Sequence, residues 1–163
     1  MHPENIQQIV EEIAPLIEGR YFGKMFQLGP LAWAIDVGLR DGRYLFVSSD
    51  PTSPRLYLIK RRIRDLEKHS LSQSQFAQLM SSKISGAHVV TITRDPAERV
   101  IRLTLEAREE TGNARIWILL VQLTGRSANL FLLDKDGILR ERQMNAGVLD
   151  FRDRHHRALQ FTF

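Results

Sequence analysis

The sequence predicts an α+β fold, an antiparallel β-sandwich with flanking helices. Three observations predict this class. An amphipathic helical pattern opens the chain, a shorter helical pattern lies near its middle, and short β-rich segments joined by tight turns make up most of the remainder. Serial short strands favour antiparallel pairing, and two helices that do not alternate with strands argue against a doubly wound parallel sheet.

The length of 163 residues is that of one ordinary domain, which can bury a hydrophobic core without disulfide bonds or metal ions. No linker-like stretch interrupts the chain before about Asn145. We therefore expect one domain over residues 1–144. Residues 145–163 are expected to form a basic C-terminal extension or the start of a connection to further domains.

The first helix is predicted at the start of the chain. Its apolar residues recur at helical spacing, at Ile6, Ile9, Val10, Ile13 and Ile17. Pro3 suits a first helical turn, and Glu4 suits the positive end of the helix dipole. Pro15 has no backbone N–H and predicts a kink or a loosened turn, and Gly19 predicts the end of the helix.

The period of the pattern changes to two after this helix. Residues 31–39 alternate between apolar side chains and small or polar ones, which predicts a strand with one buried face. Asp41-Gly42 predicts a hairpin turn into a partner strand over residues 44–47. Ser49-Asp50-Pro51 breaks that strand before a short one over residues 55–59, and we expect a basic loop to follow.

The second half of the chain reads as one short helix and then strands. Ser72 and Gln75 have the spacing of a capping box and predict a helix that Gly86 ends. The β-rich segments that follow, separated by turn-forming sequences, cover residues 88–93, 98–107, 115–123 and 129–133. Asp136-Gly137 predicts a last hairpin.

The charge is unevenly distributed, although the formal net charge is only +4. The first 19 residues contain acidic side chains and no lysine or arginine, whereas later segments are basic. The basic clusters are Arg55, Lys60, Arg61, Arg62 and Arg64, and then Arg140, Arg142, Arg152, Arg154 and Arg157. Such clusters are typical of a surface that faces phosphate groups, and charge alone leaves a solvated loop and tail as the alternative.

Several functional classes are excluded by residues that are missing. Cysteine is absent, so disulfide bonds and thiolate zinc sites cannot form, and a reducing, cytoplasmic location is expected. The five histidines have no partners at metal-ligand spacing, and neither a phosphate-binding glycine loop nor a nucleophile elbow occurs. We therefore expect no catalytic residue, no metal ion, no cofactor and no small-molecule substrate.

Three short segments together resemble a known family. They are Thr93–Leu103 (TRDPAERVIRL), Thr124–Leu130 (TGRSANL) and Ser48–Pro51 (SSDP). Each is weak alone, but their order and spacing, with an amphipathic helix in front and a short helix between, resemble the N-terminal domain of the NFACT proteins. These proteins were once called fibronectin-binding proteins and include a ribosome quality-control factor. The resemblance covers nearly all of the chain.

The resemblance implies a function and a finer fold. It implies a non-enzymatic, cytoplasmic RNA-binding domain that contacts transfer RNA and the stalled large ribosomal subunit, with no membrane partner. It also implies a fold similar to the N-terminal domain of the formamidopyrimidine-DNA glycosylases.

Two motifs supply the strongest candidate residues. Glu98 and Arg99 stand where the family carries an acidic residue and an arginine implicated in productive transfer RNA engagement; the acid is glutamate here in place of aspartate. The pattern alone leaves open a structural ion pair at a strand end. Gly125, Arg126 and Asn129 match the family's Gly-Arg-x-x-Asn turn, in which the arginine projects from a tight loop. The alternative is a strand connection capped by the asparagine.

The remaining candidates are basic residues of one segment. Arg55 corresponds to an arginine that follows the family's Ser-x-x-Pro segment, and Lys60, Arg61 and Arg62 are expected to add electrostatic support. The aromatic residues show no base-stacking pattern, and we expect Trp33 and Trp117 in the core. Recognition should therefore depend on shape and phosphate groups.

Two other functions remain open. The family's older name implies a fibronectin-binding surface adhesin, although we expect neither an export signal nor an anchor here. The fold resemblance implies a glycosylase-like DNA-binding protein without catalysis. Pro3-Glu4 matches the proline and glutamate that those glycosylases use, but the nitrogen of Pro3 is an amide behind His2 and cannot act as a nucleophile.

Overall fold

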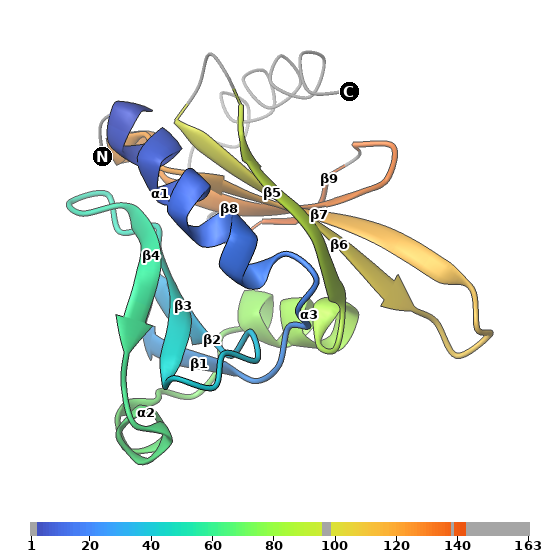
Figure 1. Ribbon diagram of the computed structural model, residues 1–163, viewed down its shortest axis with the longest axis horizontal. Helices are drawn as coiled ribbons and strands as arrows, with labels where there is room; N and C mark the ends of the chain where they lie inside the picture. Colours follow the sequence, from blue (N-terminus) through green and yellow to red (C-terminus); the bar gives the residue numbers. More distant parts are fainter. Residues whose placement is uncertain (1–2, 96–98, 138, 143–163) are drawn as a thin grey trace.

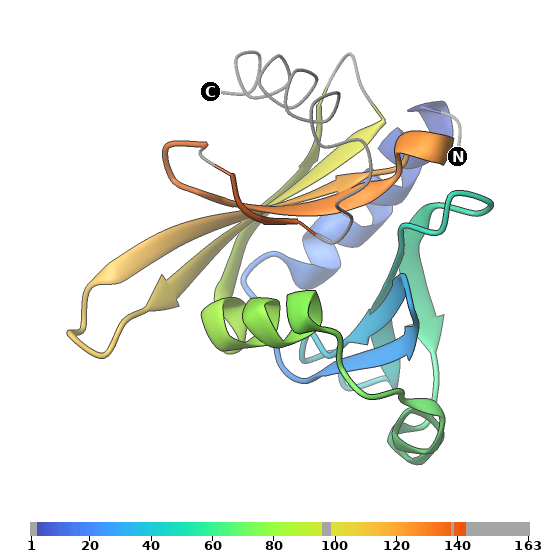
Figure 2. The ribbon, with the colours of Figure 1, turned by 180° about the vertical axis from the view of Figure 1, so that it is seen from behind.

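Two antiparallel sheets and three α-helices make up the computed structural model, which describes residues 3–95, 99–137 and 139–142. The small sheet has the strand order β1-β2-β3-β4, and the large sheet has the order β5-β6-β7-β8-β9 (Figures 1 and 2). The small sheet contains β1 (Met25–Gly29), β2 (Ala32–Ile35), β3 (Arg43–Ser48) and β4 (Arg55–Lys60). The large sheet contains β5 (His88–Arg94), β6 (Val100–Arg108), β7 (Ala114–Gln122), β8 (Asn129–Asp134) and β9 (Leu139–Arg142). The predicted α+β class with antiparallel pairing is confirmed.

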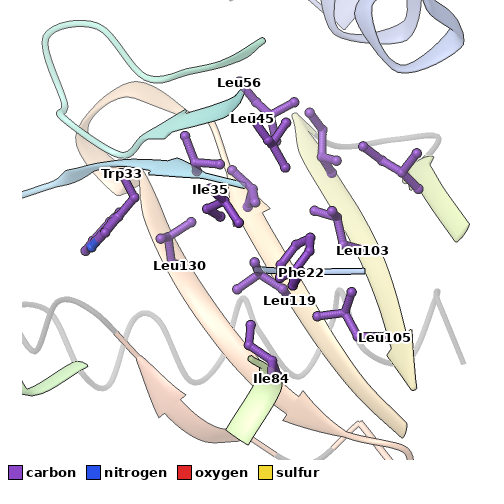
Figure 3. Close-up of a cluster of buried hydrophobic side chains, with 14 of the residues drawn as sticks. Phe22, Trp33, Ile35, Leu45, Leu56, Ile84, Leu103, Leu105, Leu119 and Leu130 are labelled. Carbon is purple, nitrogen blue, oxygen red and sulfur yellow. The ribbon is translucent and has the colours of Figure 1, made fainter. Parts of the chain in front are cut away.

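One hydrophobic core is shared by the two sheets and by the helices α1 (Pro3–Ile17) and α3 (Gln75–Ile84). Figure 3 shows Trp33, Ile35 and Leu45 of the small sheet turned towards Leu119 and Leu130 of the large one. Trp33 and Trp117 are 0% and 3% exposed, so their predicted place in the core is confirmed. None of the helices in the described part of the chain is long and apolar enough to cross a membrane.

Helix α1 matches its prediction closely. Ile6, Val10, Ile13 and Ile17 are all buried, and the helix packs on β5 and β4. The helix continues past Pro15 to Ile17, because a missing N–H in the last turn removes only one hydrogen bond. Gly19 then adopts a φ of 87°, the left-handed conformation that ends helices at glycine.

The small sheet differs from the prediction in two strands. The strand predicted over residues 31–39 ends at Ile35, and β1 was not predicted. The side chain of Asp36 accepts a hydrogen bond from the N–H of Gly38 at 2.9 Å, and Gly38 has a φ of 77°. This local turn ends the strand while Val37 remains buried, so the alternating pattern outlasts the strand.

A helix, α2 (Ile63–His69), stands where a basic loop was predicted. Its one buried side chain, Leu66, packs on the outer face of the small sheet. The residues of that outer cluster are Phe26, Ala34, Tyr44, Phe46, Ile59 and Leu66. The prediction of a loop is wrong because two apolar residues, Ile63 and Leu66, in a short charged segment are too few to show a helical period, and tertiary packing of Leu66 stabilises the helix instead.

The predicted capping box of α3 is also wrong in its position. The cap is Ser74, whose hydroxyl accepts a hydrogen bond from the N–H of Ala77 at 3.2 Å, and Gln75 is the first helical residue. The backbone N–H of Ser74 is itself held by the side-chain oxygen of Gln27 at 2.7 Å. A contact from β1 therefore determines where this helix begins. Gly86, with a φ of 81°, ends the helix region as predicted.

Replacing Ser74 by alanine should lower the free energy of unfolding by about 1 kcal/mol, because the first turn loses its side-chain acceptor. Chemical denaturation measures the change. Ser72→Ala is the matched control, since Ser72 is exposed and lies before the helix. A larger loss for Ser72→Ala than for Ser74→Ala would contradict this capping assignment.

The large sheet follows the predicted segments to within about two residues. Its strands are joined by tight turns in which Gly112 and Gly137 have positive φ, at 86° and 78°. Both faces of β6, β7 and β8 carry buried apolar side chains. The inner face joins the shared core, and the residues of the outer face are Val100, Ile116, Ile118, Leu120, Phe131 and Leu133.

Candidate functional site

Arg99 and Arg126 lie at the same end of the large sheet. Arg99 directly precedes β6, and Arg126 lies in the 3₁₀ turn η1 (Gly125–Ser127) that follows β7. Because β6 and β7 are antiparallel neighbours, with Val100 opposite Gln122, the start of one strand meets the end of the other. The N–H of Leu123 donates to the carbonyl of Arg99 at 2.8 Å and closes this end. We call the pair the Arg99–Arg126 end.

Both residues of this pair are exposed. Within the described residues neither one forms an ion pair, whereas Arg43 and Arg115 lie 2.6 Å and 3.4 Å from carboxylate oxygens of Asp41 and Glu109. An exposed guanidinium offers N–H donors in a planar fork that matches the oxygens of a phosphate group. Glu98 lies outside the described residues, so its role beside Arg99 stays a prediction.

The turn around Arg126 contains a buried part and an exposed part. Gly125 has a φ of 65°, which favours glycine, and the N–H of Ala128 donates to the Gly125 carbonyl at 2.9 Å. Asn129 is fully buried, and its side-chain oxygen accepts from the N–H of Leu130 at 2.8 Å. Asn129 therefore has a structural place in the turn, and Arg126 is the residue that faces solvent.

Sequence reasoning missed two arginines that support this end. Arg102 lies 3.6 Å from the carboxylate of Asp95, and the two side chains are only 14% and 9% exposed. Burial lowers the pKa of Arg102 from its ordinary value, and the charge of Asp95 opposes that shift. Arg94 donates from Nε to the side-chain oxygen of Gln7 at 2.9 Å and joins β5 to α1. These contacts fix the strand ends beside Arg99.

The alternating pattern of β6 could have drawn attention to Arg102, because it places Arg102 on the same face of the strand as Val100 and Thr104. The sequence shows that this face lies opposite the core residues Ile101 and Leu103. It does not show that Arg102 is itself largely covered on that face, so Arg102 was not singled out from the sequence.

Arg55 occupies the outer face of the small sheet. Its guanidinium carbon lies 5.3 Å from the ring centroid of Phe46 and 5.7 Å from that of Tyr57. Hydrogen bonds from the N–H and hydroxyl of Thr52, together with the charge of Arg55, lower the pKa of Asp50 nearby. The two rings hold this exposed cation in place, which reduces the entropy that a phosphate contact would cost.

Aromatic residues that are scattered in the sequence gather on this face. Phe26 and Tyr44 meet edge to face at 6.2 Å, and Phe46 and Tyr57 lie 5.4 Å apart. Phe26, Tyr44 and Phe46 are at most 9% exposed, so their rings are mainly packing residues. Only strand pairing brings them together, which explains why no pattern was visible in the sequence.

Lys60, Arg61 and Arg62 lie away from the Arg99–Arg126 end. All three are exposed, at the far end of β4 from Arg55 and at the start of α2. Figure 2 shows the short orange turn of η1 beside the N-terminal end of α1, with α2 at the opposite end of the molecule. The predicted candidates therefore do not form one patch. The electrostatic support expected from Lys60, Arg61 and Arg62 stays a prediction, and it would act from a separate part of the surface.

No group of three histidine, aspartate or glutamate side chains among residues 3–95, 99–137 and 139–142 is placed to hold a metal ion. The chemistry that the Arg99–Arg126 end offers is binding of anionic groups through guanidinium donors.

Comparison with known proteins identifies a matching family model and solved structures with a similar fold. Residues 5–144 match the family model described as NFACT N-terminal and middle domains. No curated protein matches the chain by sequence. Solved structures that resemble it include the N-terminal domain of the fibronectin-binding protein PavA from Streptococcus pneumoniae, with a TM-score of 0.78 and 20% identity over 88% of this chain.

Two further structures have the same fold. The N-terminal part of the fibronectin/fibrinogen-binding protein of Streptococcus suis gives a TM-score of 0.76 at 18% identity over 85% of the chain. The fibrinogen-binding protein of Staphylococcus aureus gives 0.73 at 17% identity over 88% of the chain. The chain spans about half of these structures, 54% of the first and 51% of each of the others.

Proposed function

The chain belongs to the NFACT family, and we propose that it acts there as an RNA-binding domain which contacts transfer RNA and the large ribosomal subunit. The observation that carries this proposal is the Arg99–Arg126 end, where two exposed guanidinium groups without carboxylate partners among the described residues project from one sheet end. RNA offers such groups a regular array of phosphate oxygens.

The rigidity of this end supports the proposal. Arg99 is held through its carbonyl by Leu123, and Arg126 lies in a turn that is closed by the Gly125–Ala128 hydrogen bond. Fixed backbone positions reduce the cost of ordering the two side chains on binding. We propose that Glu98, which precedes Arg99, helps to orient it, and that Arg55 contributes a second, separate phosphate contact.

Salt titration of the complex with transfer RNA tests this proposal. The logarithm of the association constant should fall linearly with the logarithm of the salt concentration, by about 0.7 to 0.9 per phosphate group contacted. Arg126→Ala should make the slope shallower by about one contact. A binding constant that does not change with salt would contradict a phosphate-directed interface.

A surface adhesin is the second candidate, because the similar solved structures are named for binding fibronectin or fibrinogen. Fibronectin binding that saturates and persists at high salt would favour it, since nonspecific adhesion of a basic protein is screened. A glycosylase-like DNA-binding domain is a third, weaker candidate that would bind duplex DNA at least as well as transfer RNA.

A further inference from the structure

A second feature of the molecule is a cavity of about 380 Å³ where the end of α3 meets the start of β5. Its lining residues are Tyr21, Ser82, Lys83, Ser85, Gly86, His88, Glu106, Ala107 and Arg108. His88 stands opposite Glu106 in the β5–β6 register, whereas Arg94 stands opposite Ile101 at the other end of the same pair. The cavity is therefore separate from the Arg99–Arg126 end.

Tyr21 presents an exposed aromatic ring at this cavity. The residue is 62% exposed, and its ring centroid lies 5.3 Å from that of His88 with 50° between the ring planes. Most large apolar or aromatic side chains of the described residues are buried, so the exposed ring of Tyr21, beside the half-buried His88, offers a face for a planar ligand.

The backbone around the two rings is held in place by four hydrogen bonds. Gly86 N–H donates to the Phe22 carbonyl at 2.6 Å, and Phe22 N–H donates to the Ala87 carbonyl at 2.9 Å. Val89 N–H donates to the Arg20 carbonyl at 2.7 Å, and the Val89 carbonyl accepts from Gly19 N–H at 2.8 Å. Because Phe22 and Ala87 are buried, Tyr21 and His88 are positioned before any ligand arrives.

The charges of the lining favour an anion. Lys83 and Arg108 contribute two positive charges, against the one negative charge of Glu106. Lys83 lines the cavity, and its ammonium lies 5.2 Å from the ring centroid of Trp117, a core residue outside the lining. Cations and the Tyr21–His88 ring pair in one hollow combine two kinds of recognition, of phosphate and of a planar ring.

We propose that this cavity binds a nucleotide, with its phosphate at Lys83 and Arg108 and its base against the Tyr21–His88 ring pair. The volume lies within the range of small-ligand pockets and admits one nucleotide. A free nucleotide and the terminal nucleotide of an RNA strand share this chemistry. None of the residues of the Arg99–Arg126 end lines the cavity, so nucleotide binding here is independent of the proposed function.

Titration of the isotope-labelled chain, followed by the amide resonances of Tyr21, Gly86 and His88, tests this site. The probes are 5′-AMP, adenosine, inorganic phosphate and an RNA trinucleotide. 5′-AMP should bind more tightly than adenosine or phosphate alone, since it engages both parts of the site. Equal binding of 5′-AMP and the trinucleotide identifies a free nucleotide as the source, and tighter binding of the trinucleotide identifies an RNA end.

Two variants divide the site into its parts. Tyr21→Leu should weaken 5′-AMP binding at least about fivefold, because base stacking is lost from an exposed position whose backbone contacts remain. Lys83→Gln should weaken binding of 5′-AMP and leave adenosine unchanged. Lys68→Gln is the matched control, since it removes the same charge from exposed α2. Absence of binding by 5′-AMP and trinucleotide at about 10 mM, or equal affinity in Tyr21→Leu and the unmodified chain, would overturn the proposal.

Discussion

Replacing both Arg99 and Arg126 by alanine should weaken transfer RNA binding by at least about tenfold at low salt. Each hydrogen bond to a charged group contributes about 1.5 to 3 kcal/mol, and two such contacts are removed together. Both side chains are exposed and make no ion pair with described residues, so the substitution leaves the fold intact. Equilibrium binding to bulk transfer RNA at a fixed salt concentration measures the change.

The matched control for this variant removes the same charge elsewhere. Arg61→Ala combined with Arg62→Ala neutralises two exposed arginines at the α2 end. It should reduce affinity by a smaller factor, because only long-range attraction is lost. Equal losses in the two double variants would show that net charge alone governs binding and would contradict a defined contact at the Arg99–Arg126 end.

Leu119→Ala should lower the free energy of unfolding by about 2 to 5 kcal/mol, the largest stability effect we expect. Leu119 is 1% exposed in β7 and lies in the core that the two sheets share (Figure 3). Truncation there loses the transfer free energy of the side chain and leaves a cavity between the sheets. Urea denaturation followed by tryptophan fluorescence measures it, since Trp33 and Trp117 lie in the same core.

Leu71→Ala makes the same substitution at a position that is 49% exposed. Its backbone N–H donates to the Gln27 carbonyl at 2.7 Å, and alanine retains that hydrogen bond. The expected change is within about 0.5 kcal/mol. Comparable destabilisation by the two variants would contradict a single core built between the sheets.

The strands of the large sheet were predictable because each one is marked by residues within its own segment of the chain. Alternation marks β6, apolar and β-branched runs mark β5, β7 and β8, and glycines with positive φ mark turns at Gly112 and Gly137. Helix α1 was predictable for the same reason, since its apolar residues recur over four turns. In contrast, β1 and α2 depend on contacts with residues far along the chain, such as Leu66 against the small sheet. The sequence of such an element alone therefore shows only a weak helical or strand pattern.

The candidate site was predictable in part. The resemblance to the family's Gly-Arg-x-x-Asn turn implied a projecting arginine, and Arg126 is exposed there. The sequence did not show how far apart the candidate residues lie in the folded chain. Arg55 and Lys60 are near neighbours in the chain, but the extended strand β4 carries them apart by about 3.3 Å per residue. The buried pair Arg102 and Asp95 was hidden because charged residues are usually read as exposed.

The most direct test of the RNA-binding account is to titrate transfer RNA into the isotope-labelled chain and map the amide resonances that shift. The account predicts that the largest shifts occur at Arg99, Val100, Gly125 and Arg126, with smaller ones around Arg55. Shifts confined to residues 60–64, or spread evenly over all exposed basic residues, would contradict it and would reduce the Arg99–Arg126 end to ordinary surface charge.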